Sequence, residues 1–67
     1  MIISYKKLWI TLIKKDITKT KLRENIGIST STLSKLAKNK YVSMEVLVKI
    51  CNELNCDIGD IVEMIKE

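Results

Sequence analysis

The sequence predicts an all-α fold of five helices, and three observations support that prediction. A helix-start signal recurs five times, apolar residues repeat at helical spacing, and no proline interrupts the 67 residues. Sustained alternation of apolar and polar residues, which would indicate strands, occurs nowhere. We expect helices at residues 4–15, 18–26, 29–38, 43–55 and 57–66, joined by short connections into one compact domain over residues 1–67.

Each predicted helix begins with the same arrangement of a capping residue and an apolar pair. The polar side chain accepts a hydrogen bond from a free N–H of the first turn, and the apolar pair fixes the angle at which the chain enters. No Glu or Gln stands three residues after any cap; Asp60, three residues after Asp57, comes nearest to a capping box. The five instances are Ile3-Ser4…Leu8, Ile17-Thr18…Leu22, Ile28-Ser29…Leu33, Val42-Ser43…Leu47 and Cys56-Asp57…Ile61.

Apolar residues at i, i+3 and i+4 predict the inward faces of these helices. Asn39 follows the third helix at the position of a left-handed cap, a conformation that Asn tolerates better than most residues. The predicted inward stripes are Tyr5, Leu8, Trp9, Leu12 and Ile13; Leu33, Leu36 and Ala37; Leu47, Ile50, Cys51 and Leu54; and Ile58, Ile61, Val62 and Ile65.

Charge is distributed unevenly along the chain. Residues 1–41 carry ten Lys or Arg and two Asp or Glu, a net charge of +8. Residues 42–67 carry two basic and six acidic residues, a net charge of −4. We therefore expect one part of the surface to attract a polyanion, either nucleic acid or an anionic membrane surface, with an acidic part behind it.

The sequence argues against a secreted, membrane-spanning or metal-binding protein. No run reaches the roughly 20 apolar residues of a membrane span, and the start lacks the order of a secretion signal, so a cytoplasmic location is expected. Cys51 and Cys56 form a lone pair and the chain has no His, so the ligands of a zinc site are lacking. We interpret both cysteines as small core residues and expect no metal and no cofactor.

The segment 18–38 predicts a helix-turn-helix. Its two helices are separated by Ile26-Gly27-Ile28-Ser29, and two helices joined by a three- or four-residue turn containing Gly form that motif. Gly27 suits the positive φ needed for one helix to end and the next to begin almost at once. The same spacing fits an ordinary C-cap in any helical bundle. The function of the pair therefore depends on the outer face of its second helix.

The outer face of helix 29–38 contains no acid and no bulky apolar residue. Solvated helices usually mix Glu with Lys, so the absence of carboxylates favours a surface that faces phosphates. Short hydroxyls let a helix approach base edges, and Lys35 is long enough to reach guanine O6 or N7. The helix N-terminus also offers unpaired N–H groups to a phosphate. The residues of this face are Ser31, Ser34, Lys35 and Lys38, with Thr30 and Thr32 on its flanks.

These residues resemble the core of the Cro/C1-type (XRE-like) helix-turn-helix repressors. The chain departs from the family pattern at Lys19, Arg23 and Ala37, where Gln, a small Ala and Glu are common. The tail over residues 50–61 is similar to that of small stand-alone regulators of bacteria, phages and mobile elements. The matching core is Thr18-Lys19-x-x-Leu22-x-x-x-x-Gly27-Ile28-Ser29-x-Ser31-Thr32-Leu33-Ser34-Lys35-Leu36.

The resemblance implies a lambda-repressor-like fold and a repressor that binds an operator in double-stranded DNA as a homodimer. It implies no catalysis, no small-molecule substrate and no membrane. Base contacts are expected from Thr30, Ser31, Ser34 and Lys35. Phosphate contacts are expected from Lys19, Ser29, Thr32, Lys38, Asn39 and Lys40.

Three other functions fit parts of the sequence. A protein-interaction module of the same fold, such as an antitoxin or antagonist, would use helix 57–66, where Met64 falls outside the inward stripe. Homodimerisation explains the same feature and is the commoner arrangement. An enzyme lacks support because the chain has no His, no Gly-rich phosphate loop and no base beside its hydroxyls. Binding of helix 4–15 to a membrane surface conflicts with the inward position expected for its Trp9.

Overall fold

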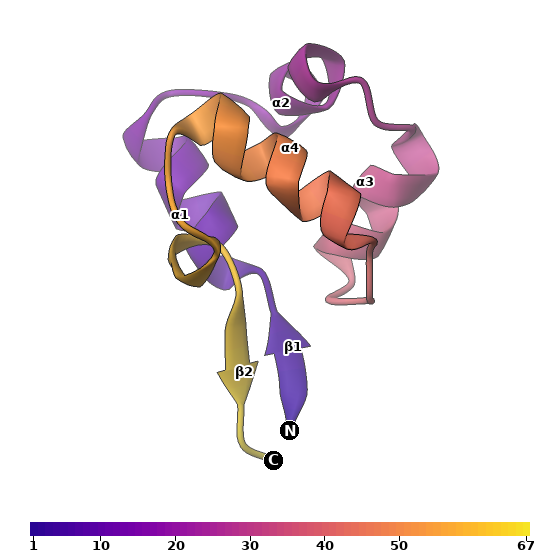
Figure 1. The fold of residues 1–67 in the computed structure, drawn as a ribbon, viewed down its shortest axis with the longest axis vertical. Coiled ribbons are helices and arrows are strands. Elements are labelled where there is room, and N and C mark those ends of the chain that lie inside the picture. The colour runs from indigo at the N-terminus through magenta and orange to yellow at the C-terminus, as the bar shows by residue number, and fades with distance from the viewer.

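The computed structural model describes all 67 residues as a helical body with a small two-stranded sheet (Figure 1). The antiparallel strands extend from the body toward the end at which both termini lie. The prediction of a mostly helical fold is confirmed, and the prediction of five helices is wrong. In chain order the elements are β1 (Ile2–Ser4), α1 (Lys6–Lys14), α2 (Lys19–Ile26), α3 (Thr30–Ala37), α4 (Met44–Leu54), the 3₁₀ turn η1 (Ile58–Asp60) and β2 (Glu63–Ile65).

Capping hydroxyls begin three of the four helices, as predicted. Each accepts a hydrogen bond of 3.0 to 3.2 Å from the N–H three residues further along the chain. Such a cap contributes about 1 kcal/mol to helix stability. The predicted bounds of these helices agree with the observed ones within one residue at each end. The caps are Thr18 of α2, Ser29 of α3 and Ser43 of α4.

A residue in the left-handed conformation follows each of the four helices, with φ between 51° and 71°. The N–H of the next residue donates to the carbonyl five residues before it. This closure satisfies carbonyl groups that the end of a helix leaves without partners. The left-handed cap predicted at Asn39 is confirmed. The four residues are Asp16, Gly27, Asn39 and Asn55.

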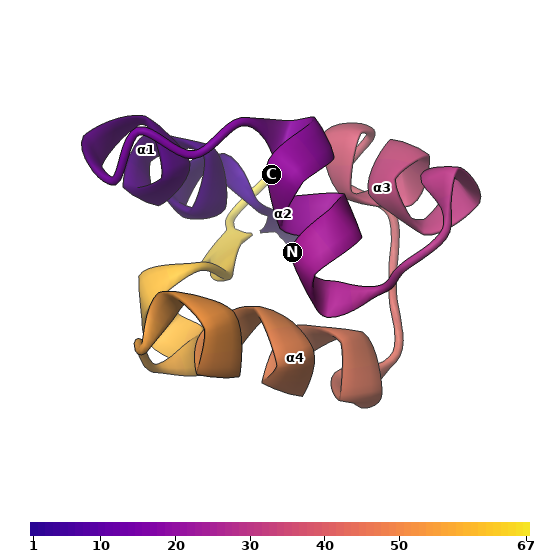
Figure 2. The ribbon, with the colours of Figure 1, turned by 90° about the horizontal axis from the view of Figure 1, so that it is seen from above.

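The core lies between α4 and the other three helices. Figure 2 shows α4 along one side of the molecule and α1, α2 and α3 along the other. The stripe predicted on α4 is confirmed, since Leu47, Ile50 and Leu54 are buried. By contrast, α3 contributes a single buried residue, Leu36. The complete set of buried apolar residues is Tyr5, Leu8, Leu12, Leu22, Ile28, Leu36, Leu47, Ile50, Leu54 and Ile61.

The two ends of the chain pair as strands, and the predictions for them are wrong. Ser4 lies in β1 instead of capping a helix from residue 4, although its hydroxyl accepts from the Lys6 N–H at 3.2 Å. In place of a helix at 57–66, the chain makes one 3₁₀ turn and then β2, in which Ile65 pairs with Ile2. A ten-residue helix is marginal alone, whereas β-branched residues fit a strand.

The predicted approximation to a capping box stabilises the start of η1. The Asp57 carboxylate accepts from the Ile58 N–H at 2.7 Å, and the Asp60 carboxylate accepts from the Asp57 N–H at 3.0 Å. The signal at residues 56–61 therefore marks a real helical start. The helix ends after one turn because the following residues pair with β1.

Some residues predicted on inward stripes are exposed. Ile13 is 77% exposed because it lies on the last turn of α1, where Leu12 occupies the adjoining place in the core. Ala37, the last residue of α3, is also exposed, as are Ile58 and Ile65. None of the helices has the length and apolar character needed to cross a membrane.

Candidate nucleic-acid interface

A three-residue turn, Gly27 to Ser29, connects α2 to α3. Gly27 has a φ of 71°, and nothing lies within 4 Å of a Cβ placed there, so backbone conformation and not space favours glycine. Ile28 is buried and anchors the turn in the core. The Arg23 guanidinium donates to the Ile28 carbonyl at 3.4 Å and so ties α2 to the turn. This geometry confirms the predicted helix-turn-helix.

The outer face of α3 presents polar side chains that have no partner within the protein. Four of its residues are exposed and make no side-chain hydrogen bond. Their hydroxyl and ammonium groups are therefore free to bond to another molecule, and no carboxylate lies among them. They are Thr30, Ser31, Ser34 and Lys35, the residues for which base contacts are predicted.

The N-terminus of α3 is organised by two hydroxyls for which phosphate contacts are predicted. Ser29 Oγ accepts from the Thr32 N–H at 3.1 Å and lies 3.1 Å from Thr32 Oγ1. Ser29 is exposed and Thr32 is half-buried. The cap leaves the N–H groups at the start of α3 directed outward, which is the arrangement that accepts an anion at a helix N-terminus.

The lysines on this part of the surface are not neutralised by neighbouring acids. The only ion pairs within 4.0 Å join Lys49 to Glu45 and the N-terminal amine to Glu67. None of the ten Lys and Arg residues of the segment 1–41 is therefore paired with a carboxylate. Lys38 and Lys40, both exposed, flank the C-terminal end of α3. The excess of basic residues predicted in the segment 1–41 is thus not neutralised by neighbouring carboxylates.

Lys19, the first residue of α2, lies against an aromatic ring. Its Nζ is 4.4 Å from the centroid of the Trp9 ring, within the range of a cation–π contact. Trp9 is half-buried on α1, so the contact links α1 to the start of α2. The ammonium group remains exposed, and an exposed contact of this kind contributes only about 0.5–1 kcal/mol.

Asn39, the remaining residue predicted to contact a phosphate, is bonded within the protein. Its Oδ1 accepts from the Tyr5 N–H at 3.1 Å. The next carbonyl, that of Lys40, accepts from the Tyr5 hydroxyl at 2.7 Å. Tyr5 is fully buried, and burial raises the pKa of its hydroxyl above the ordinary value. The segment that follows α3 is therefore attached to the start of α1.

A family model described as the Cro/C1-type HTH DNA-binding domain matches residues 7–67. The chain belongs to this family. It is 38% identical over 56 residues to the uncharacterized HTH-type transcriptional regulator YozG of Bacillus subtilis (strain 168), a match that covers 81% of this chain and 67% of YozG. Among solved structures it is similar to the transcriptional regulator VanUg in crystal form II, at 53% identity and a TM-score of 0.95, covering 98% of this chain and 88% of VanUg.

Family membership establishes a helix-turn-helix DNA-binding domain of the kind found in transcriptional regulators. The partner that this domain binds is DNA, and the family is not one of enzymes, as the sequence predicted. The resemblance noted in the segment 18–36 is confirmed by a match extending through the C-terminal strand.

Two thiols of this Cro/C1-type domain lie at the end of α4. Cys51 and Cys56 are free, half-buried and packed against the core. Burial raises the pKa of the Cys56 thiol above its ordinary value, and the neighbouring Cys51 adds to the shift. A raised pKa lowers the thiolate fraction and with it the reactivity of the thiol. No cluster of three or more His, Cys, Asp or Glu is placed to hold a metal ion.

Three residues that support the interface of this Cro/C1-type domain are absent from the predicted set. Tyr5 bonds to the segment after α3, Trp9 receives Lys19, and Arg23 secures the turn. A hydroxyl on an otherwise apolar stripe is the one sequence signal that points to Tyr5. Arg23 occupies a position where the family commonly has a small residue, and its hydrogen bond to the turn gives the larger side chain a structural use.

Proposed function

We propose that the protein is a sequence-specific transcriptional repressor that inserts α3 into the major groove of an operator. The observation that supports this proposal is the outer face of α3, with four exposed polar side chains free of partners and no carboxylate among them. A solvated helix usually mixes Glu with Lys, whereas a face of hydroxyls and lysines can bond to bases and phosphates without repelling them. Occupancy of the operator then excludes other proteins from the same DNA.

In this mechanism the outer face of α3 reads bases, and the residues around it bind phosphates. Thr30, Ser31, Ser34 and Lys35 read base edges, with the Lys35 ammonium donating to guanine O6 or N7. Around them, contacts to phosphates set register and affinity without conveying sequence. The proposed phosphate-binding residues are Lys19, Ser29, Thr32, Lys38 and Lys40.

We further propose that the repressor binds as a homodimer through one DNA-binding domain, residues 1–67, in each copy. Two copies of α3 then enter successive major grooves, with half-sites about 34 Å apart. Exposed apolar side chains support self-association, among them Met44, Val48 and Ile58, which line a groove of about 220 Å³ on α4 and η1. Sedimentation of the free protein and of its DNA complex measures the stoichiometry.

The same groove favours one alternative, a protein-interaction module for which DNA binding is secondary. Met44 is 62% exposed and Val48 is 51% exposed, values high enough for a partner protein to bury useful apolar area there. The two functions differ in their partner. A repressor binds its operator as the purified protein alone, whereas an antitoxin or antagonist co-purifies with its partner protein.

Selection from random duplex DNA by the purified protein tests the proposal, with binding titrated at two salt concentrations. A symmetric motif is expected, together with an affinity that falls steeply as salt rises. Recovery of no motif, with binding that depends on salt alone, would contradict sequence-specific repression. Matched pull-downs with wild type and Met44→Asp then test the alternative.

A further inference from the structure

The segment that follows α3 is held by a single residue from a distant part of the chain. Tyr5 donates from its backbone N–H to Asn39 Oδ1 and from its hydroxyl to the Lys40 carbonyl, at 3.1 and 2.7 Å. The two contacts span 34 and 35 residues of sequence. Tyr5 stands between β1 and α1 and is fully buried. We call this pair of hydrogen bonds the Tyr5 clamp.

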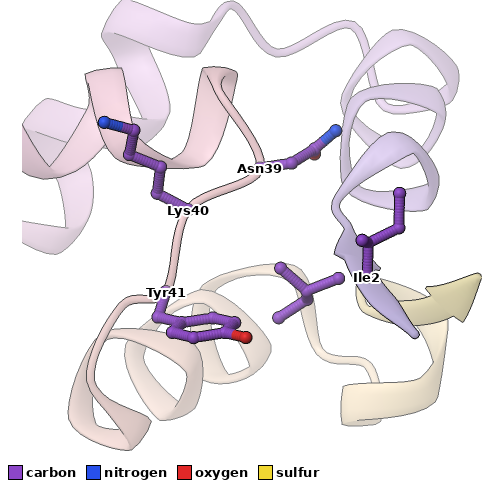
Figure 3. Close-up of a pocket in the computed structure, with 5 residues that line it drawn as sticks. Ile2, Asn39, Lys40 and Tyr41 are labelled. Carbon is purple, nitrogen blue, oxygen red and sulfur yellow. The ribbon is translucent and has the colours of Figure 1, made fainter.

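The backbone conformation at the end of α3 places the Asn39 side chain where Tyr5 can bond to it. Its φ of 56° turns the chain out of the helix, while its own N–H donates to Leu36 and the Lys40 N–H donates to Lys35. Figure 3 shows the Asn39 side chain directed toward β1 and the start of α1, whereas Lys40 points the opposite way. The same turn thus places an amide inward and an ammonium outward.

Between its ends, α3 is held by two apolar side chains, the buried Leu36 and the partly buried Leu33, which packs against the core. Leu36 is the only one of its eight residues that is buried, compared with three residues of α4. A helix with so little buried surface can tilt at low cost unless its ends are held. The Ser29 cap and the buried Ile28 hold the first end, and the Tyr5 clamp holds the second.

We propose that Tyr5 and Asn39 are positioning residues that set the angle at which α3 meets DNA and thereby determine sequence specificity. The proposal rests on the proposed function, because the angle of α3 matters only if α3 reads bases. It also changes the role of Asn39, from a predicted phosphate contact to a residue that acts through the position of α3 and Lys40. Base readout requires placement within fractions of an ångström, whereas electrostatic attraction to phosphates does not.

The chain contains a matched control for Asn39. Asn55 ends α4 in the same left-handed conformation, with φ of 51°, and its side chain makes no hydrogen bond. Asn39→Gly and Asn55→Gly therefore make the same chemical change at equivalent backbone positions, and both retain access to positive φ. Only Asn39→Gly removes an acceptor of the clamp. Tyr5→Phe removes the other bond while keeping the aromatic ring.

The measured quantity is the ratio of nonspecific to specific dissociation constants, determined on the selected operator and on a scrambled duplex. Partial unfolding lowers both affinities by the same factor and leaves the ratio unchanged. We expect Asn39→Gly to lower the ratio about five- to tenfold, the effect of losing one hydrogen bond of about 1–1.5 kcal/mol. Tyr5→Phe should lower it by a similar or smaller factor, and Asn55→Gly should leave it within twofold.

The outcomes separate this proposal from the proposed function. If wild type binds both duplexes equally, sequence-specific repression is wrong and the positioning role falls with it. If wild type prefers the operator and Asn39→Gly and Tyr5→Phe keep the full ratio, only the positioning role is wrong. Equal losses in Asn39→Gly and Asn55→Gly would also overturn it, because the effect would then belong to glycine at a helix end.

Discussion

Helices α3 and α4 begin and end alike but face different environments. Each starts at a serine whose hydroxyl accepts from the N–H three residues on, and each is followed by an asparagine with positive φ. Between these ends, α4 buries three residues and pairs its one lysine, Lys49, with Glu45 at 3.7 Å. α3 buries one residue and leaves its single lysine, Lys35, without an acidic partner.

The difference shows how one set of local signals builds both a core helix and a recognition helix. Capping stabilises the ends of either helix without specifying what its faces contact. α4 is positioned by a stripe of three buried residues, whereas α3 is positioned by Leu36, the partly buried Leu33 and the contacts at its two ends. A helix held in this way can devote most of its surface to another molecule.

The largest expected difference between the two helices concerns folding stability. Ile50→Ala on α4 should lower the free energy of unfolding by about 2–5 kcal/mol, because it removes a fully buried side chain and leaves a cavity. Ser34→Ala on the outer face of α3 should change it by less than about 0.5 kcal/mol. Urea unfolding followed by circular dichroism measures both. Comparable losses in the two variants would mean that the outer face of α3 contributes to the fold.

Three of the four helices were predictable from local signals at their starts, whereas α1 was predictable from its apolar stripe alone, since Ser4 does not cap it. Thr18, Ser29 and Ser43 cap the residues directly after them, and Gly27 and Asn39 turn the chain where they stand. The strands were not predictable in this way, since Ile2 pairs with a residue 63 positions away and each strand has only three residues. Too few residues alternate to reveal a period of two.

In the candidate interface too, the features set by local sequence were predictable and the tertiary contacts were not. The outer face of α3 follows from a helical wheel, and its predicted residues are exposed where the wheel places them. The Tyr5 clamp joins residues 34 and 35 positions apart, and the contact of Lys19 with Trp9 depends on how α1 packs against α2. Such tertiary contacts leave no periodic trace in a single sequence.

For DNA affinity the order of the two helices should be reversed: a substitution on α3 should have the larger effect and one on α4 the smaller. Lys35→Ala on α3 should cost about 1–3 kcal/mol of binding free energy and relax the preference at one base pair. Lys49→Ala on α4 removes the same charge from the acidic part of the molecule and should leave affinity for the operator nearly unchanged. Titration of both variants against single-substituted operators measures the effect. An equal loss for Lys35→Ala on every operator would show that this lysine contacts only phosphate.

The turn that begins α3 provides a test of backbone conformation. Gly27→Ala should destabilise the protein by about 1–2 kcal/mol because an L-residue is strained at a φ of 71°. Gly27→Asn should cost less, since Asn tolerates that region and occupies it at positions 39 and 55. Thermal unfolding of the two variants checks the order. A Cβ meets no atom within 4 Å at this position, so a larger loss for Asn would contradict the backbone explanation.

A smaller effect is expected at the C-terminal end of α3. Lys38→Ala should weaken binding evenly across sequences and reduce the slope of log K against log salt concentration by about 0.9. Lys49→Ala again serves as the control and should leave the slope unchanged. Measurements at four or more salt concentrations, on operator and scrambled DNA, give the slopes. A change confined to the operator would mean that Lys38 reads sequence.

The smallest expected effect is a loss of folding stability at high pH. Ionisation of Tyr5, in the clamp of α3, and ionisation of Cys56, after α4, should cause this loss over different pH ranges. Burial raises the pKa of Tyr5 and of Cys56 above ordinary values of 10.0 and 9.0, so the unfolded chain releases these two protons first. Their contribution to stability is therefore complete below about pH 9 and is lost as the pH rises through the raised values. Cys56→Ala should remove the part of this loss that begins near pH 9, and Tyr5→Phe the part that begins near pH 10.

Midpoints of thermal unfolding, measured from about pH 8 to pH 11, distinguish the two contributions. Tyr41→Phe is the comparison variant, because Tyr41 is 80% exposed and its hydroxyl makes no hydrogen bond. It removes only the smallest contribution to the raised pKa of Tyr5, the charge of Tyr41, and leaves the burial of Tyr5 in place. If Tyr5→Phe and Tyr41→Phe showed the same dependence on pH as wild type, Tyr5 would titrate like a solvated phenol. The hydrogen bond from the Tyr5 hydroxyl to the Lys40 carbonyl would then break often, and the clamp would not fix the C-terminal end of α3.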